Sequence, residues 1–279
     1  MSGNVKECSV LFGDELQHTV PIIKTKNPHV VLRGKDGNGM SVAIPIDDNI
    51  LSKHIMLLGG IGTGKTNAFF HIINQVEKKL SENDVMIIFD TKGDFYNEFY
   101  KKGDIVISND STATGEDSLD YWNIFNEIEY GEHMVESVIE ISKSLFAEQC
   151  NKTNQIFFPN AAKDIFMACL LHFIRAFPPN VRTNKNLIYY INKTPVKEIK
   201  NMLNSYDDLR AMVSYIDNED SAQTQGVMSV LQQVVREIFV GNFSKTGTLS
   251  LKNLVRKKGG KKIFIRIRLK HRKYAYPNI

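Results

Sequence analysis

The stretch that decides the fold is Gly59-Gly60-Ile61-Gly62-Thr63-Gly64-Lys65-Thr66, which satisfies the pattern G-x-x-x-x-G-K-[ST]. Such a loop must wrap closely around a phosphate, and only glycine lets the backbone approach and adopt positive φ angles. Its N–H groups then point at anionic oxygens, and the N-terminal partial charge of the following helix acts at the same place. We therefore predict a phosphate-binding loop for a purine nucleotide, with ATP as the expected ligand.

Each residue of the loop has an expected part in binding. The Lys65 ammonium would reach the β- and γ-phosphates, and the Thr66 hydroxyl would ligate Mg²⁺. If hydrolysis occurs, Lys65 is the predicted catalytic residue. The predicted nucleotide-binding residues are Gly59, Gly60, Ile61, Gly62, Thr63, Gly64, Lys65, Thr66 and Asn67.

A nucleotide-hydrolysing enzyme of this kind also needs an acidic residue at the end of a strand, where it holds Mg²⁺ and positions water. Asp90 follows the apolar run 85–89 and is the candidate for this metal role. The alternative is that Asp90 caps a turn that Gly93 completes. The sequence leaves both interpretations open.

The segments around the loop predict an α/β domain. Strands are expected at 30–33 and 40–46, which flank a glycine-rich turn, and at 55–58, 85–89 and 104–108. A helix is expected over 64–80, because Ala68, Ile72, Ile73 and Val76 recur at helical spacing. Strands and a helix joined by short links are typical of a largely parallel sheet.

From about residue 131 the pattern becomes helical. Three amphipathic stripes predict helices; they comprise Met134, Val138, Ile141 and Leu145, then Ile165, Ala168, Cys169 and His172, then Val227, Val230, Leu231, Val234, Val235 and Ile238. The run 261–267 then predicts a return to strand. We expect an N-terminal half over 1–130, an all-α insertion over 131–240, and a return to the α/β core over 241–279.

Composition, cysteine spacing and apolar stretches narrow the class of protein further. The chain is 42% hydrophobic and 24% charged, which is ordinary for a globular protein, and Cys8, Cys150 and Cys169 are too scattered for a disulfide framework or a metal cluster. The residues at 1–14 do not read as a signal peptide. The strongest apolar stretch, 165–174, is shorter than the ~20 residues of a membrane span, so we expect a buried core helix and no transmembrane segment.

The positive charge lies at the C-terminal end. The segment 252–279 holds eleven Lys and Arg and no acidic residue. Of 35 basic residues, 24 remain elsewhere against 31 acidic ones, a net charge of −7 for the rest of the chain. A run of this kind can be a nucleic-acid-binding arm.

Several segments together resemble a known family. The resemblance is to type IV secretion coupling proteins, the TraG/TraD-type conjugative DNA translocases of the HerA–FtsK superfamily. It rests on the segment 47–66, in which His54 leads into the loop, on the turn 90–94 and on the pair Trp122-Asn123. Thr91 stands where that family has proline. The helical segment 131–240, with Phe157-Phe158-Pro159 opening one helix, is similar to the family's inserted all-α domain, and the resemblance runs from about Val30 to Ile265. Taken alone, Trp122-Asn123 is explained by packing and a helix cap, and His54 by a structural role.

The resemblance implies a RecA-like P-loop core with an all-α insertion. It also implies ATP and Mg²⁺ as ligands, a homo-hexameric ring, and partners comprising single-stranded DNA, a relaxase and a secretion channel. The expected location is the cytoplasm, or the inner face of the cell membrane as a peripheral protein. Members usually carry an N-terminal membrane anchor and a later strand ending in Asp-Glu, and this sequence has neither. We therefore expect a C-terminally truncated, partial core whose ATP turnover is near background.

The segment 266–279 is expected to be a frameshifted tail that packs poorly. Five cations follow closely after 261–265, and a strand buried on both faces could not carry them. A one-base shift of one allowed back-translation restores a sequence that resembles the family. The alternative is a native basic tail that binds DNA.

Three hypotheses for the function follow. In the first, the chain is the ATP-binding portion of a DNA-translocating ATPase. In the second, it is a regulatory or vestigial nucleotide-binding module without turnover. In the third, it is a DNA-binding protein that binds through its basic tail.

Overall fold

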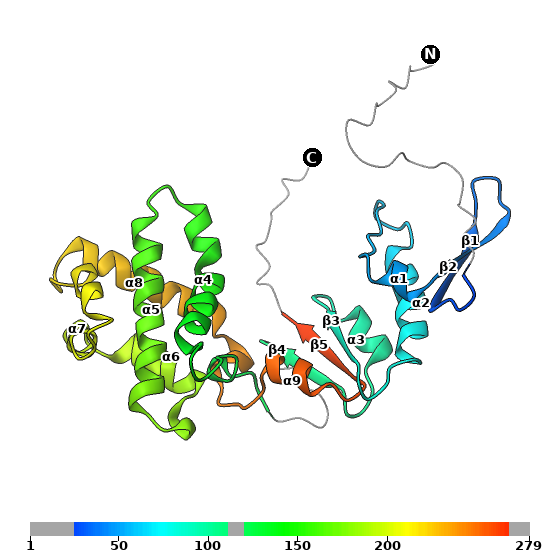
Figure 1. Ribbon diagram of the computed structural model, residues 1–279. Helices are drawn as coiled ribbons and strands as arrows, with labels where there is room; N and C mark the ends of the chain where they lie inside the picture. The colour runs from blue at the N-terminus through cyan, green and yellow to red at the C-terminus, as the bar shows by residue number, and fades with distance from the viewer. Residues whose placement is uncertain (1–24, 111–119, 268–279) are drawn as a thin grey trace, which may run out of the picture. The chain divides into compact units, whose positions relative to one another are not determined.

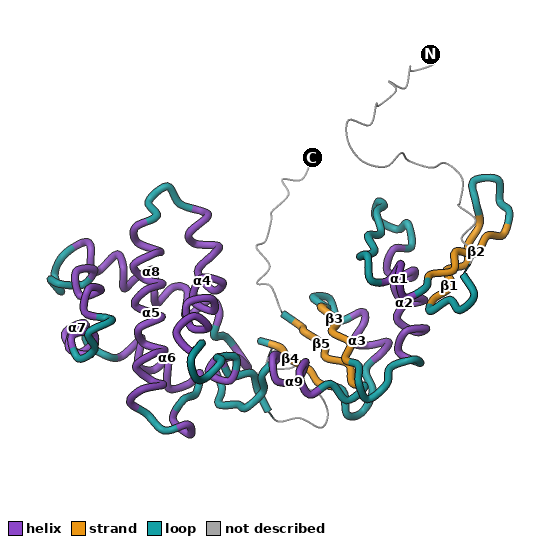
Figure 2. The backbone as a smooth tube through the Cα atoms, in the orientation of Figure 1, coloured by secondary structure: helices purple, strands orange, loops and turns teal. Residues whose placement is uncertain are grey.

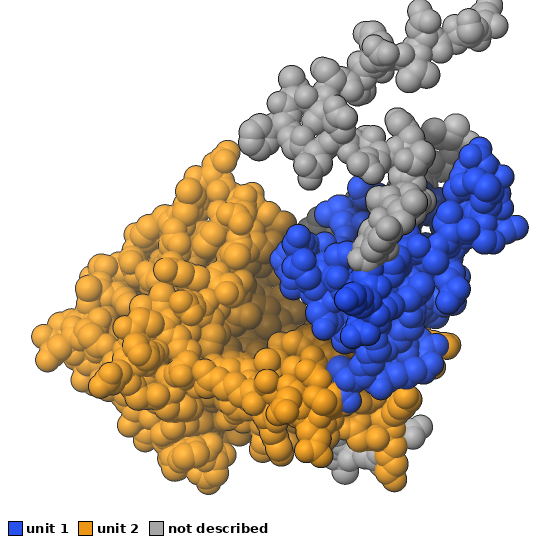
Figure 3. Space-filling view, turned by 45° about the vertical axis from the view of Figure 1, so that its right-hand side comes forward, with its two compact units in different colours: residues 1–80 blue, residues 81–279 orange. Residues whose placement is uncertain are grey.

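The computed structural model describes residues 25–110 and 120–267 of the 279-residue chain. These belong to two compact units, Met1–Leu80 and Ser81–Ile279, which Figure 3 shows in two colours.

The first unit is built on a β-hairpin. β1 (Val30–Lys35) pairs antiparallel with β2 (Ser41–Ile46), as the sequence predicted, and the turn is held by Asp36, whose Oδ1 accepts from the backbone N–H of Met40 at 2.9 Å. α1 (Asp48–Leu51) follows, and then α2 (Lys65–Glu77). Gln75 on α2 accepts from Val31 N at 2.9 Å and donates to Val31 O at 3.2 Å, so its amide continues the hydrogen bonding of β1.

The strand expected at 55–58 does not form. The chain from His54 to Gly60 is irregular, and Met56 and Leu58 are 79% and 85% exposed. An apolar run becomes a strand only when a neighbouring strand pairs with it. Within the first unit β1 and β2 pair with each other, and His54 has a φ of 58°, outside the β region. The prediction of a strand at this position was therefore wrong.

The second unit contains a parallel three-stranded sheet in the order β3-β5-β4, which confirms the predicted parallel pairing (Figure 1). β3 spans Val85–Phe89, β4 spans Ile105–Ser108 and β5 spans Lys261–Arg266. The central strand β5 comes last in sequence, and Ser108 Oγ donates to the Arg266 carbonyl across 158 residues. α3 (Asp94–Phe99) and α9 (Leu251–Lys257) lie beside the sheet.

The segment expected to be frameshifted begins inside β5. Arg266 is the last residue of this strand, and its guanidinium carbon lies 4.4 Å from the centre of the Tyr96 ring. The Arg266 side chain is only partly buried and packs on this ring, so the expected poor packing is wrong for Arg266. The residues 268–279 lie outside the described part of the chain.

The remainder of the second unit is helical (Figure 2). Its long helices, α4 (Met134–Lys152), α5 (Phe157–Ala176) and α8 (Ala222–Ile238), are the three that the sequence predicted. The shorter helices were not predicted; they are η1 (Ile124–Asn126), η2 (Pro179–Val181), α6 (Asn184–Lys193), α7 (Val196–Asn204), η3 (Arg210–Tyr215) and η4 (Gly241–Ser244). They are only three to ten residues long, too short to carry the long amphipathic stripes that predicted α4, α5 and α8.

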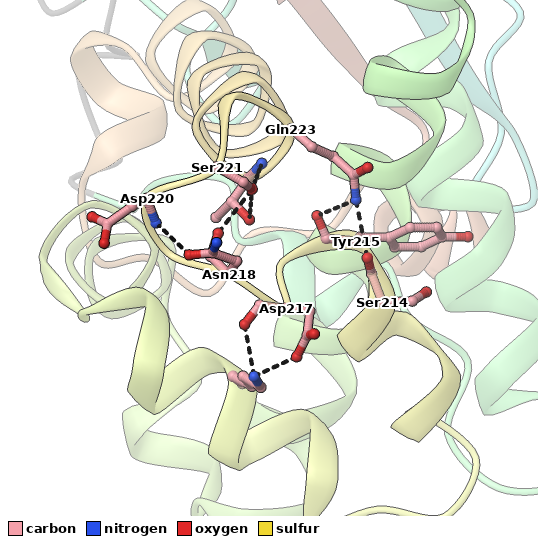
Figure 4. A network of polar contacts seen from close by, with 9 residues as sticks. Ser214, Tyr215, Asp217, Asn218, Asp220, Ser221 and Gln223 are labelled. Carbon is pink, nitrogen blue, oxygen red and sulfur yellow. Dashed lines mark hydrogen bonds and ion pairs between the residues drawn. The ribbon is translucent and has the colours of Figure 1, made fainter.

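The core of this helical part forms around α5, against which α4 and α8 pack. α5 is long and apolar enough to cross a bilayer, but 61% of its apolar window is buried inside the protein, as expected of a core helix. The loop that leads into α8 is held by polar contacts (Figure 4). Gln223 donates to the carbonyls of Ser214 and Tyr215, and Ser221 caps α8 by accepting from Thr224 N.

Candidate functional site

The loop 59–64 closes on itself in the way its glycines predict. Gly62 and Gly64 have φ angles of 81° and 83°, a region that side chains disfavour. A Cβ at Gly59 would lie 2.5 Å from Thr63 Oγ1, so a side chain there would displace this hydroxyl. Thr63 Oγ1 donates to Gly60 O at 2.9 Å and fastens the turn.

The loop leads directly into the N-terminus of α2. Gly64 is the N-cap residue, no side chain of the described residues caps it, and the first turn of the helix has no acidic residue. The first four N–H groups of a helix have no partner within it. These amides and the helix dipole therefore present a positive end that suits an anion.

Lys65 lies over the loop. Its Nζ donates to Gly59 O at 2.7 Å and to Gly60 O at 2.5 Å. The cation is thus held at the turn by carbonyls that an anionic ligand would replace. Thr66 and Asn67 are exposed in the first turn of α2. The structure gathers the residues predicted to bind nucleotide in one loop and helix start, and their individual roles stay predictions.

Asp90 has the geometry of a cap. Its Oδ1 accepts from Gly93 N and its Oδ2 from Tyr96 N, both at 2.8 Å, and the residue is 3% exposed. Gly93 has a φ of 90° and starts α3. Both carboxylate oxygens are therefore already bound to backbone amides. The Mg²⁺ role of Asp90 stays a prediction.

Trp122 and Asn123 have the packing and capping roles expected of them. Asn123 Oδ1 accepts from Phe125 N at 3.2 Å, and the Trp122 ring stacks on Phe239. Trp122 Nε1 donates to Glu127, whose carboxylate also accepts the backbone N–H groups that open α9. Glu127 was not among the predicted residues, because its partners in α9 lie more than 120 residues further along the chain.

The described residues offer no ready-made metal cluster. In residues 25–110 and 120–267, no group of three or more His, Cys, Asp or Glu side chains could hold a metal ion.

A family model described as the type IV secretion-system coupling protein DNA-binding domain matches residues 40–278. The chain belongs to this family. The predicted resemblance is thus confirmed, and the matched range includes the loop 59–66 and β5. No curated protein matches the chain.

Solved coupling proteins share the fold. The bacterial conjugative coupling protein TrwBdeltaN70, in a trigonal form with sulphate, is 16% identical with a TM-score of 0.61, over 80% of this chain and 49% of that chain. Its unbound monoclinic form is 15% identical with a TM-score of 0.61, over 80% and 48% of the two chains. The plasmid coupling protein TrwB in complex with ADP and Mg²⁺ is 16% identical with a TM-score of 0.60, over 80% and 49%.

These matches confirm the predicted fold class, a RecA-like P-loop core with an all-α domain. The chain spans about half the length of the coupling proteins it matches.

Proposed function

We propose that this chain is the ATP-binding portion of a type IV secretion coupling protein. The observation that carries the proposal is the glycine loop 59–64, whose positive-φ turns lead into the uncapped N-terminus of α2. A phosphate group fits there because backbone amides and a helix dipole converge on it. The relative crystallised with ADP and Mg²⁺ supports this choice of ligand.

On ATP binding, the Lys65 ammonium would exchange its two loop carbonyls for the β- and γ-phosphates. Thr66 would supply a hydroxyl ligand to Mg²⁺. In the full-length protein, ATP hydrolysis would drive single-stranded DNA towards a secretion channel. The proposed assembly is a homo-hexamer that receives its substrate from a relaxase, in the cytoplasm or at the inner face of the membrane.

The assignment of domains along the chain is also a proposal. Residues 1–130 would form the nucleotide-binding half, 131–240 an all-α insertion, and 241–279 the return to the core.

A second candidate is a nucleotide-binding module without turnover. It is favoured by Asp90, because both of its carboxylate oxygens already cap the turn before α3. This candidate shares the nucleotide site and differs only in the chemistry that follows.

The test of nucleotide binding is Lys65→Ala, measured by calorimetry with ATP and Mg²⁺. The side chain lies at the start of α2 and is only half-buried, so the variant should fold normally and lose detectable ATP binding. Lys53→Ala, an exposed lysine of the same unit, is the control and should bind as wild type does. Equal ATP affinity in Lys65→Ala and wild type would show that the loop does not hold the nucleotide.

A further inference from the structure

The basic C-terminal stretch separates into engaged and free cations in the structure. Lys252 Nζ donates to Ile128 O, Arg256 pairs with Glu129 at 3.3 Å, and Lys262 is buried against Asp104 at 3.2 Å. In contrast, the ammonium groups of Lys257, Lys258 and Lys261 form no hydrogen bond or ion pair with the described residues, and all three side chains are exposed. Half of the cations between 252 and 262 are therefore structural, and half are available to a partner.

The three free lysines share one turn between α9 and β5, which we call the lysine turn (257–261). The backbone of this turn is fixed: Gly259 N donates to Glu82 O at 2.8 Å and Gly260 N donates to Asp84 O at 2.9 Å. Lys258 has a φ of 54°, so the turn is held in a conformation that is uncommon for a lysine. The cations are thus presented from a defined site.

This turn lies at the edge of the sheet where the parallel strands begin. The loop before β4 reaches the same edge and adds Lys101 and Lys102, which are exposed and have interactions of their own. The opposing charges are those of Glu82, Asp84 and Asp104. Asp84 accepts from Ser81 N and Oγ, and Asp104 is paired with Lys262. Positive charge remains in excess at this edge.

We infer that the lysine turn binds the phosphate backbone of DNA, an inference that rests on the proposed DNA partner of the family. Lysine ammonium groups bind phosphates as point charges, and such contacts supply sequence-independent affinity. The turn borders a cavity of only ≈ 150 Å³, below the ~300 Å³ of small-molecule pockets. A free nucleotide would therefore not fit, whereas a strand can lie across the surface.

A membrane surface is the competing polyanion. Stable attachment through a basic patch is helped by apolar side chains that enter the bilayer. The large hydrophobic side chains that are exposed in the described residues, such as Phe157, Tyr189 and Phe89, do not belong to the lysine turn or to the loops beside it. The turn is polar, which favours DNA.

The test measures DNA affinity of the full chain against salt, using a fluorescein-labelled oligothymidylate and fluorescence anisotropy. The combined variant Lys257→Gln, Lys258→Gln and Lys261→Gln removes three phosphate contacts. The slope of log K against log salt should become shallower by about 2, and binding at about 0.1 M salt should fall tenfold to 100-fold, roughly. A second variant, Glu82→Gln, should strengthen binding.

The matched control removes the same charge from the helical part, where Lys185, Lys193 and Lys197 are also exposed. Changing these three to glutamine should leave the slope as in wild type. An unchanged slope in the lysine-turn variant would overturn the inference. It would also be overturned if neutralising Arg268, Lys270, Arg272 and Lys273 removed the whole salt dependence, or if the turn variant lost only binding to phosphatidylserine vesicles. No DNA binding by wild type would instead reject the proposed DNA partner itself.

Discussion

Lys262 and Asp104 form a buried ion pair that fastens the central strand. The Lys262 ammonium lies 3.2 Å from Asp104 Oδ2, and the two side chains are 5% and 9% exposed. Asp104 Oδ1 also accepts from Lys262 N at 3.0 Å. One carboxylate thus balances a buried cation and ties β5 to the loop before β4.

Removing this carboxylate should destabilise the protein strongly. Asp104→Ala leaves the Lys262 charge buried without its carboxylate, and we expect the free energy of unfolding to fall by about 3 kcal/mol. Urea denaturation followed by circular dichroism measures the change. Glu219→Ala, on an exposed loop, is the control and should stay within about 0.5 kcal/mol of wild type. If Asp104→Ala is as stable as this control, the pair has no structural role.

Gly247 is expected to tolerate no side chain. A Cβ there would lie 2.0 Å from the carbonyl oxygen of Tyr121, and that oxygen accepts from Leu249 N at 2.9 Å. Both clashing groups are backbone, so relief requires the chain to move. Gly247→Ala should lower the free energy of unfolding by about 1–3 kcal/mol in urea denaturation. Gly34→Ala, where a Cβ meets nothing within 4 Å, should have a much smaller effect, and equal losses would contradict this explanation.

Stability should depend on pH through His172. Burial lowers the pKa of His172 below its usual 6.5, and its Nδ1 lies 3.0 Å from Tyr206 Oη, while Arg175, bound to Asp208, stacks on the Tyr206 ring. Between the lowered pKa and about 6.5 the unfolded chain binds more protons than the folded one, so stability rises with pH in this window. Above about 6.5 this dependence ends.

Thermal melts at a series of pH values test this prediction. His172→Gln keeps a polar partner for Tyr206 but cannot titrate, so its stability should fall less on acidification than that of wild type. His71→Gln, at an exposed position on α2, should retain the dependence of wild type. Identical pH profiles for His172→Gln and wild type would assign the effect to other groups.

ATP turnover by this chain should be near background. Lys65 and Thr66 are in place, but the candidate acid Asp90 is engaged by Gly93 N and Tyr96 N. A phosphate-release assay with saturating single-stranded DNA should give a rate well below the ~1–10³ s⁻¹ typical of enzymes. The rate of phosphate release by Lys65→Ala, which should not bind ATP, defines the background. DNA-stimulated turnover within the typical range, absent from that variant, would show that a carboxylate of this chain completes the site.

Short-range patterns in the sequence sufficed for the local elements. Apolar runs located β3 and β4, helical stripes located α4, α5 and α8, and the glycine pattern located the loop before α2. These succeed because backbone sterics and the periodicity of burial act within a few residues. The strand predicted at 55–58 does not form, because an apolar run alone does not reveal whether a neighbouring strand pairs with it.

By itself, then, the sequence determined the three long helices, the strands of the second unit and the position of the glycine loop before α2. Only the tertiary structure decided that β5 lies between β3 and β4, that Asp90 caps a turn, and that Lys262 is buried while Lys257, Lys258 and Lys261 stay free. Identical lysines a few residues apart acquire different environments because strand pairing turns one toward the carboxylate of Asp104 and leaves its neighbours at the solvent edge. That carboxylate lies 158 residues earlier in the chain, a separation over which no local pattern operates.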